Sequence, residues 1–505
     1  MPNASITRVG VRGRGSDGGE SGYDLSGFED AGLTRERLAS LLDEHEKRVA
    51  PMCERLWGYY ANEERVRVDA LGGVVRERYQ AGGLPGRLRR RGAGDDRADT
   101  PTVVIENDIA WRVNALVDLA FGELPTVEAE GDDAALVGRC VRAAFEASGG
   151  DVFLRDVALL GSVHGWVDLV VRTEAVFERV AGMSRGEIER GGDALAEELA
   201  GLVRIEAVSP ERGVALVSER DYRAIDAYVI RTRVGSGDAE REVLEVLSDR
   251  RRRVFVDGEA ESDAANRLGV LPVVHVQHQS VPFRYAGVGE VAGLIALQDE
   301  LNTRLSDRAH RVTMQSFNMY LAKGLEGVSE LAVGPGKVWL TDNPDAAVHA
   351  FGGDGHSPSE ESHIDELREA LDKASGVSPV VLGVVRAKLG HLSSVNALRM
   401  TLLGVLTKTR QRRLSYGRGL SACADVVLRT LEGAGALRGG VKRTVGFRWR
   451  DALPTTEEER LRSARSKLEL GADADEVLDG LGLGAEMPEG VGADERNGNI
   501  NGKGA

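Results

Sequence analysis

The sequence is poor in cysteine and in long apolar runs. Its three cysteines, Cys53, Cys140 and Cys423, lie far apart in 505 residues. They predict neither a disulfide framework nor a cysteine metal site, and they fit a reducing compartment. No apolar run approaches the ~18 residues of a membrane span, and the polar, glycine-rich start has no apolar segment of a secretory signal. Neither secretion nor membrane insertion is therefore expected.

Positive charge is also in deficit, because 65 Lys and Arg face 80 Asp and Glu, a net charge of −15. A protein that grips nucleic acid tightly needs clustered cations to neutralise phosphates. Local basic clusters exist at 87–91, 250–253 and 408–413, but each is bordered by acidic or glycine-rich sequence and fits a solvated face. Tight DNA binding is therefore not expected to be the main role.

Catalytic and cofactor motifs are absent. Gly13, Gly15 and Gly18 satisfy G-x-G-x-x-G, but no strand precedes them and no helix follows, so they do not predict a dinucleotide site. His349 and His356 fall in a Gly/Pro-rich stretch that cannot fix metal geometry. The sequence contains no H-E-x-x-H, paired-cysteine or G-x-S-x-G motif. We expect no cofactor and no enzymatic activity.

The composition predicts an ordered protein of several modules. Apolar residues make up 42 % and charged residues 29 %, which excludes wholesale disorder, and the length predicts about three domains. Thr34 is expected to cap a helix, and a second helix is expected to begin at Asn107 and to end at Phe121-Gly122. Turn-separated strands are expected at 166–171, 203–208, 227–233, 242–247, 253–256 and 273–277. Without regular strand–helix alternation, the predicted class is α+β.

Long helical periods dominate the second half. Apolar residues recur at helical spacing from Gly289 to about Leu321, with polar residues such as Asn302 between them, and again over 359–374. A third long helix is expected at 395–431, bent near Gly417 and Gly419, and a strand follows at 444–449. We expect a strand at 337–340 and a charged helix at 457–470. The apolar stripes predict packing against helices of neighbouring copies, with the polar faces lining a channel.

Several segments, in this order, are similar to the portal proteins of tailed bacteriophages, especially the siphophage-type portal family. An early helix that ends in an aromatic-Gly-x-x-Pro turn lies at 107–125, and a helix–glycine–strand step lies at 158–171. A strand that starts with proline lies at 269–274, and a glycine loop with the long helix after it lies at 287–302. The two flanks of an inner loop are 375–379 and 393–398.

The resemblance implies a multidomain α+β portal fold with an α+β wing, long stem helices, a small α/β clip and a short helical crown. On this sequence the implied parts are a disordered arm (1–34), the wing (35–287), the first stem helix (288–320), the clip (321–359), the second stem helix (360–378), the tunnel loop (379–394), a long bent wing helix and strand (395–450), the crown (451–487) and a disordered tail (488–505).

The resemblance also implies a function. It predicts a homo-oligomeric ring of about twelve subunits at one capsid vertex, a channel for DNA packaging and ejection in the virion, assembled in the host cytoplasm. Expected partners are the terminase large subunit, a head-completion or adaptor protein, the major capsid and scaffolding proteins, and double-stranded DNA in transit, with no membrane partner. Another phage head structural protein, or an enzyme with an unrecognised site, remains the alternative.

Two sets of residues carry this prediction. Arg386, Lys388 and His391 in the inner loop are expected to make brief, salt-sensitive phosphate contacts. The residues expected to pack the stem are Leu294, Leu301, Leu305, Leu367 and Leu371.

Overall fold

The computed structural model describes residues 23–68, 74–88, 103–122, 125–131, 133–235, 239–315, 319–323, 347–351, 358–382, 400–450, 452, 457–471 and 477. The chain divides into two units, Met1–Trp449 and Arg450–Ala505. In the second unit the described structure is essentially one exposed, charged helix, α12 (Glu457–Glu469), at the position where the sequence predicts it.

The helices of the first unit begin where the sequence supplies caps. Thr34 accepts a hydrogen bond from Arg37 N and starts α1, and Asn107 accepts one from Ala110 N and starts α3. The predicted cap at Thr34 is confirmed, as are the start of α3 next to Asn107 and its end at Phe121. The α-helices are α1 (Arg35–Glu44), α2 (Ala50–Ala61), α3 (Asp108–Phe121), α4 (Ala134–Ala147), α5 (Gly150–His164), α6 (Glu174–Val180), α7 (Arg185–Ala200), α8 (Ile295–Gln315), α9 (Pro358–Ser375) and α11 (Leu403–Gly433). One π-helical turn (His45–Val49) joins α1 to α2, and 3₁₀ turns lie at Glu29–Ala31, Tyr79–Gly83 and Pro379–Leu382.

The described strands pair antiparallel throughout, which confirms the predicted α+β class. One sheet has the order β10-β9-β8-β7-β6 and another the order β11-β4-β5, while β14–β3, β1–β2 and β12–β13 are two-stranded. Their bounds are β1 (Glu64–Val68), β2 (Val74–Arg78), β3 (Thr126–Glu130), β4 (Trp166–Arg172), β5 (Arg204–Val208), β6 (Gly213–Val217), β7 (Ile225–Val234), β8 (Arg241–Ser248), β9 (Arg251–Val256), β10 (Glu259–Ala265), β11 (Val273–Gln277), β12 (Met319–Lys323), β13 (Ala347–Phe351) and β14 (Thr444–Arg448).

The start of the described chain packs on the five-stranded sheet. Leu25, Phe28 and Leu33 are buried against apolar residues of β6, β7, β8 and β9 in a separate core cluster. The prediction of a disordered arm to residue 34 is therefore wrong for residues 23–34. Apolar residues are sparse there, but the three that occur are spaced to cover one face of the sheet.

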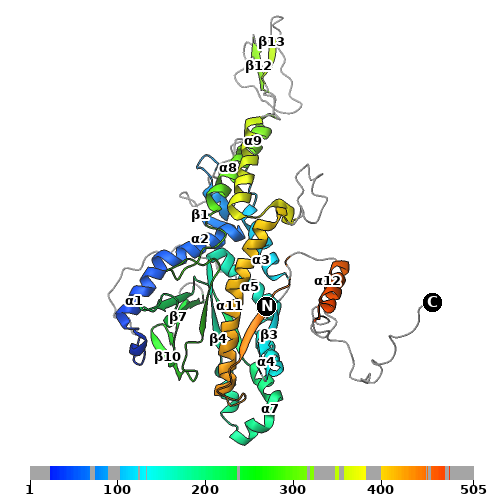
Figure 1. Ribbon diagram of the computed structural model, residues 1–505. Helices are drawn as coiled ribbons and strands as arrows, with labels where there is room; N and C mark the ends of the chain where they lie inside the picture. Colours follow the sequence, from blue (N-terminus) through cyan, green and yellow to red (C-terminus); the bar gives the residue numbers. More distant parts are fainter. Residues whose placement is uncertain are drawn as a thin grey trace, which may run out of the picture. The chain divides into compact units, whose positions relative to one another are not determined.

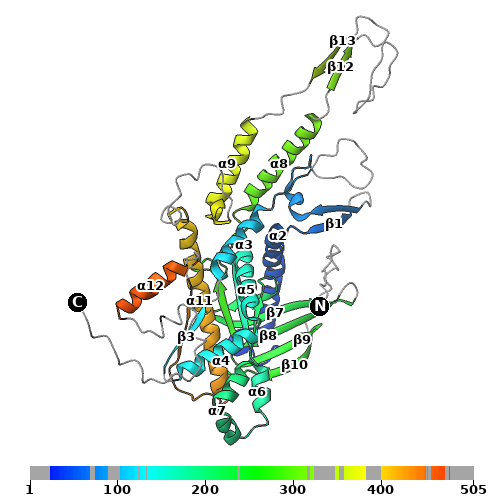
Figure 2. The ribbon, with the colours of Figure 1, turned by 90° about the vertical axis from the view of Figure 1, so that its right-hand side faces the viewer.

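The largest core is helical. It joins residues of α3, α4, α5 and α11 with β4 and the start of α8, and α11 runs beside α3 and α5 (Figures 1 and 2). α11 continues through Gly417 and Gly419, where the sequence predicts a bend. At Gly419 a Cβ atom would stand 2.4 Å from a methyl carbon of Val276, so the glycine allows β11 to lie against the helix.

The first long helix is shorter than predicted. α8 begins at Ile295, not Gly289, because residues 287–290 bind the end of α5 through their backbone. Glu290 N donates to Ser162 O, and a Cβ at Gly289 would stand 2.7 Å from Val163 O. Residues held in this way by another element cannot form the first turn of a helix.

Several predictions fall outside the described residues. These are the strand at 337–340, most of the clip, the inner loop from 383, and the tail. Within the clip, the structure describes the hairpin formed by β12 and β13.

Candidate functional site: a helix pair and its buried base

The most distinctive arrangement in the first unit is the pair of helices α8 and α9. They lie side by side (Figures 1 and 2). The last turns of α8 contact the first turn of α9, which shows that the two helices run in opposite directions. Arg311 forms an ion pair with Glu360, and Arg308 approaches Glu361 to 3.8 Å. Residues 316–357, which include the β12–β13 hairpin, connect the two helices.

The leucines predicted to pack the stem lie in this pair and are buried within one chain. Leu294, Leu301 and Leu371 are at most 1 % exposed, Leu367 is also buried, and Leu305 packs half-buried against the same core. Ile364 of α9 completes the apolar contact. These side chains therefore hold α8 and α9 to their own chain before any second copy is present.

The polar side of α8 is buried as well. Asn302 Oδ1 accepts from Glu106 N at 3.1 Å, and its Nδ2 donates to Gln80 Oε1 at 3.0 Å. Ser306 Oγ accepts from Val104 N at 3.0 Å. The prediction that Asn302 lines a channel is wrong, because its amide is fully buried and hydrogen-bonded to Glu106 in the segment before α3 and to Gln80.

The end of α9 is attached to α3 through Arg112, which is 1 % exposed. Its guanidinium lies 2.7 Å from Asp372 Oδ1 and 3.1 Å from Asp108 Oδ2, and it donates to Val377 O at 3.2 Å. Two carboxylates and a carbonyl surround this buried guanidinium, so the contact fixes the exit of α9.

A second buried cluster joins the chain before α8 to α11 and to the end of α9. Glu290 Oε1 accepts from Arg412 Nη2 at 2.8 Å, and its Oε2 accepts from Lys408 Nζ at 2.5 Å. Lys408 also donates to Ser375 O at 2.6 Å. We call Glu290, Lys408, Arg412 and His278 the base cluster.

Protonation in the base cluster follows from its contacts. Burial lowers the pKa of His278. Its Nδ1 lies 2.9 Å from Tyr416 Oη, and its Nε2 lies 2.8 Å from Arg412 Nε and 3.0 Å from Glu290 Oε1. Burial alone would raise the pKa of Glu290, but His278, Lys408 and Arg412 outweigh it and hold that pKa far below its usual range. The cluster is a buried ion group in which two cations share one carboxylate.

The most enzyme-like arrangement in the described residues is also closed. Asp168, 1 % exposed, accepts from Tyr228 Oη at 2.8 Å, Tyr285 Oη at 2.7 Å and His275 Nδ1 at 2.7 Å. Burial raises the pKa of both tyrosines well above its ordinary value. These contacts join β4, β7, β11 and the segment that contains Tyr285, so the group fastens these parts of the fold together.

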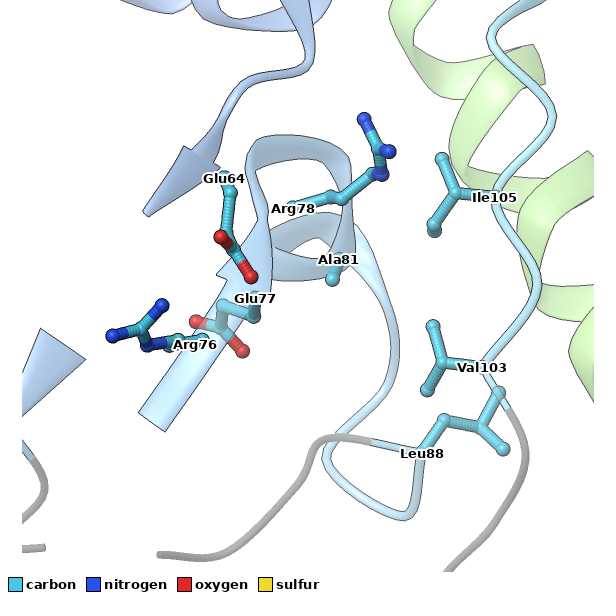
Figure 3. A pocket seen from close by; sticks show the side chains of 8 residues that line it. All are labelled: Glu64, Arg76, Glu77, Arg78, Ala81, Leu88, Val103 and Ile105. Carbon is cyan, nitrogen blue, oxygen red and sulfur yellow. The ribbon is translucent and has the colours of Figure 1, made fainter. Parts of the chain in front are cut away.

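Hollows on the described surface include two that lie beside sheets. One, of about 230 Å³, lies beside β2, where Val103, Ile105 and Leu88 face Glu64 and Glu77 (Figure 3). The other, of about 300 Å³, lies between α6 and the five-stranded sheet, and its Arg172 and Arg252 are already paired with Glu245. In neither hollow do a nucleophile and a base converge.

Other predicted features have the following outcome. Arg386, Lys388 and His391 lie outside the described residues. Among the residues that are described, His, Cys, Asp and Glu form no group of three suited to a metal ion. No helix in the described ranges has the length and apolarity to span a bilayer. The base cluster and the buried polar face of α8 were missed, since they join segments more than 100 residues apart and follow no sequence pattern.

Comparisons with known proteins give structural neighbours alone. No family model matches the chain, and no curated protein matches it significantly. It is similar to a chain of the virion of the native gene transfer agent (GTA) particle, with 12 % identity, a TM-score of 0.41, and coverage of 74 % of this chain and 89 % of that chain. It is also similar to a chain from the neck of the empty GTA particle computed with C6 symmetry, with 12 % identity, a TM-score of 0.40, and coverage of 74 % of this chain and 90 % of that chain. A chain from the neck of the native particle computed with C12 symmetry has 13 % identity, a TM-score of 0.42, and coverage of 74 % of this chain and 89 % of that chain. Likeness at this level does not establish a shared function.

Proposed function

We propose that the chain is a phage portal protein, the subunit of a ring that forms the DNA channel at one capsid vertex. One observation carries this proposal. The segments on which the resemblance to portal proteins depends include 393–398, which lies outside the described residues. The others are scattered from residue 107 to 379, and they converge at the base of the α8–α9 pair.

The convergence is built from specific contacts. Gly165 ends the helix–glycine–strand segment, and a Cβ there would stand 2.6 Å from Gly287 O of the glycine loop. Gln298, in the segment that continues into α8, accepts from Ile109 N at 3.3 Å in the early helix. Sequence likeness spread over distant segments would not concentrate in one buried junction by accident, so the junction supports a common architecture for them.

The mechanical character of this junction suits a conduit. Charged groups at the base are paired and largely buried, and Gln298, Asn302 and Ser306 of α8 are buried and hydrogen-bonded. A helix pair fixed in this way can keep its direction while a polymer moves past it. Twelve copies at −15 each would carry a net charge of about −180, which would repel phosphate on average. Arg386, Lys388 and His391 would then supply brief contacts with DNA.

The partners follow from this role. The clip would seat the terminase motor and later the head-completion or adaptor protein, and the wing would contact capsid and scaffolding proteins. Packaging chemistry would belong to the motor, and the ring itself would have no catalytic activity. The virion, at one capsid vertex, would be its final location.

Assembly state tests the proposal. Purified full-length chain, at low and at moderate salt, should give rings of roughly a dozen copies with a central hole by negative-stain microscopy, and a matching native mass. Particles without a hole would favour another head structural protein. Monomers or dimers alone in both salts would contradict the proposal.

The inner loop has its own test. Arg386→Glu with Lys388→Glu should leave rings intact and lower the amount of packaged DNA, because like charge repels phosphate. The matched control is Arg185→Glu with Arg190→Glu, an equal charge change on exposed residues of α7. Equal packaging by the loop variant and the control would remove the loop from the DNA path.

A further inference from the structure

The outer face of α11 is unusual for a solvent-facing helix surface. Leu403, Thr407, Arg410, Leu414 and Arg418 recur at intervals of four and three residues on the side opposite the buried Val405, Arg412 and Tyr416. Leu403 is 59 % exposed and Leu414 66 %. Leucines at this spacing between arginines form the kind of stripe that a second helix covers. We call these five residues the α11 outer face.

Charges on α11 divide sharply between its two sides. Arg412 on the inner side binds Glu290, and Arg413 donates to Leu119 O and stacks over Trp449. Arg410 and Arg418 on the outer face form no ion pair with another residue that the structure describes. The inner arginines are therefore used by the fold, and the outer ones are available.

The outer face of α9 shows the opposite charge. Ser362, Asp365, Glu366 and Glu369 are exposed along one side of this helix. The acidic residues on its inner side, Glu360 and Asp372, already bind Arg311 and Arg112. Asp365 and Glu369 pair with no cation among the described residues. We call these four exposed residues the α9 outer face.

From this charge complementarity we propose that the α9 outer face of one copy docks on the α11 outer face of the next copy. Within one chain the two faces do not pair, although Lys408 places the end of α9 beside α11. Two different faces that fit each other make a heterologous contact, which closes into a ring when the rotation between copies allows it. The pairing rests on the self-association in the proposed function and specifies which surfaces produce it.

Cross-linking between differently labelled chains tests the pairing. The native cysteines are all buried, so Thr407→Cys and Ser362→Cys each place one accessible thiol on an outer face. The two single variants are mixed before assembly and treated with a flexible bis-maleimide. Dimers should form in the mixture and not in either variant alone. Assembly without mixed dimers would overturn the pairing and leave the ring proposal standing.

Charge exchange gives an independent test. Arg410→Glu with Arg418→Glu should abolish the ring peak in size-exclusion chromatography, and so should Asp365→Arg with Glu369→Arg. All four changes in one chain should restore the peak. Arg429→Glu with Arg438→Glu, exposed elsewhere on α11 and beyond it, is the control and should leave the peak unchanged. If the wild-type protein forms rings and both charge-reversed variants form them equally well, the pairing of the two outer faces is wrong. If the wild-type protein itself forms no rings, both the pairing and the proposed function are wrong.

Discussion

Replacing Glu290 with glutamine should strongly destabilise the first unit. The side chain keeps its size, but Arg412, 5 % exposed, and the half-buried Lys408 lose their shared carboxylate. Removing one partner of a buried ion group leaves uncompensated buried charge, which costs about 3–5 kcal/mol. Glu290→Gln should therefore lower the free energy of unfolding by that amount.

Urea unfolding followed by tryptophan fluorescence measures the loss. The matched control is Glu300→Gln, since Glu300 pairs with Arg304 one turn away with both side chains 37 % exposed. A pair of that kind contributes about 0.3–0.5 kcal/mol. The double variant Glu290→Gln with Lys408→Met should lose less free energy of unfolding than the sum of the losses of the two single variants. The reason is that Lys408→Met removes one of the cations that Glu290→Gln leaves without a carboxylate.

The comparison between the two glutamine variants decides the matter. If Glu290→Gln costs no more than Glu300→Gln, the base cluster is not a buried ion group and its role in fixing α8 and α9 must be abandoned.

Three further variants test other parts of the first unit. Leu301→Ala should cost about 2–5 kcal/mol in urea unfolding, because Leu301 is fully buried where α8 joins the core; a loss under ~1 kcal/mol, the usual size of an exposed substitution, would show that this face of α8 is not packed. Burial lowers the pKa of His164 to about 4 from 6.5. The unfolded chain therefore gains a proton that the folded chain excludes, so stability should fall by about 3 kcal/mol as pH drops from 6.5 towards 4. His164→Gln should flatten that pH profile, and an unchanged profile would contradict the assignment. Gly165→Ala should cost more than ~1 kcal/mol, since φ is 100° and a Cβ would clash with Gly287 O; a thermal scan indistinguishable from wild type would refute the close backbone contact.

Local signals in the sequence were enough to predict many elements. Thr34 and Asn107 satisfy the first turns of their helices through their own side chains, so no distant residue is needed to place those starts. Alternation in 166–171 predicts β4 because one period-two run is visible without knowledge of its neighbours. The α+β class follows from the same kind of evidence along the chain.

Predictions failed where a distant element overrides the local pattern. Periodicity continues through residues 289–294, yet α5 binds this backbone and delays α8. Asn302 looks like a solvent-facing residue, and its burial is explained by Gln80 and Glu106, which lie 222 and 196 positions earlier. Helix α7 contains Gly191 and Gly192, which conceal its period, and it was not predicted. The base cluster combines residues from three segments, so no spacing rule could find it.

The contact between Gly165, Gly287 and Gly289 has a mechanical consequence. Here backbone meets backbone, with no side chain that could change rotamer to absorb a shift. A load applied along α8 would thus be transmitted directly to the β4–β11 sheet, and the stiffness of that joint would set how far the whole subunit yields when the helix is pushed.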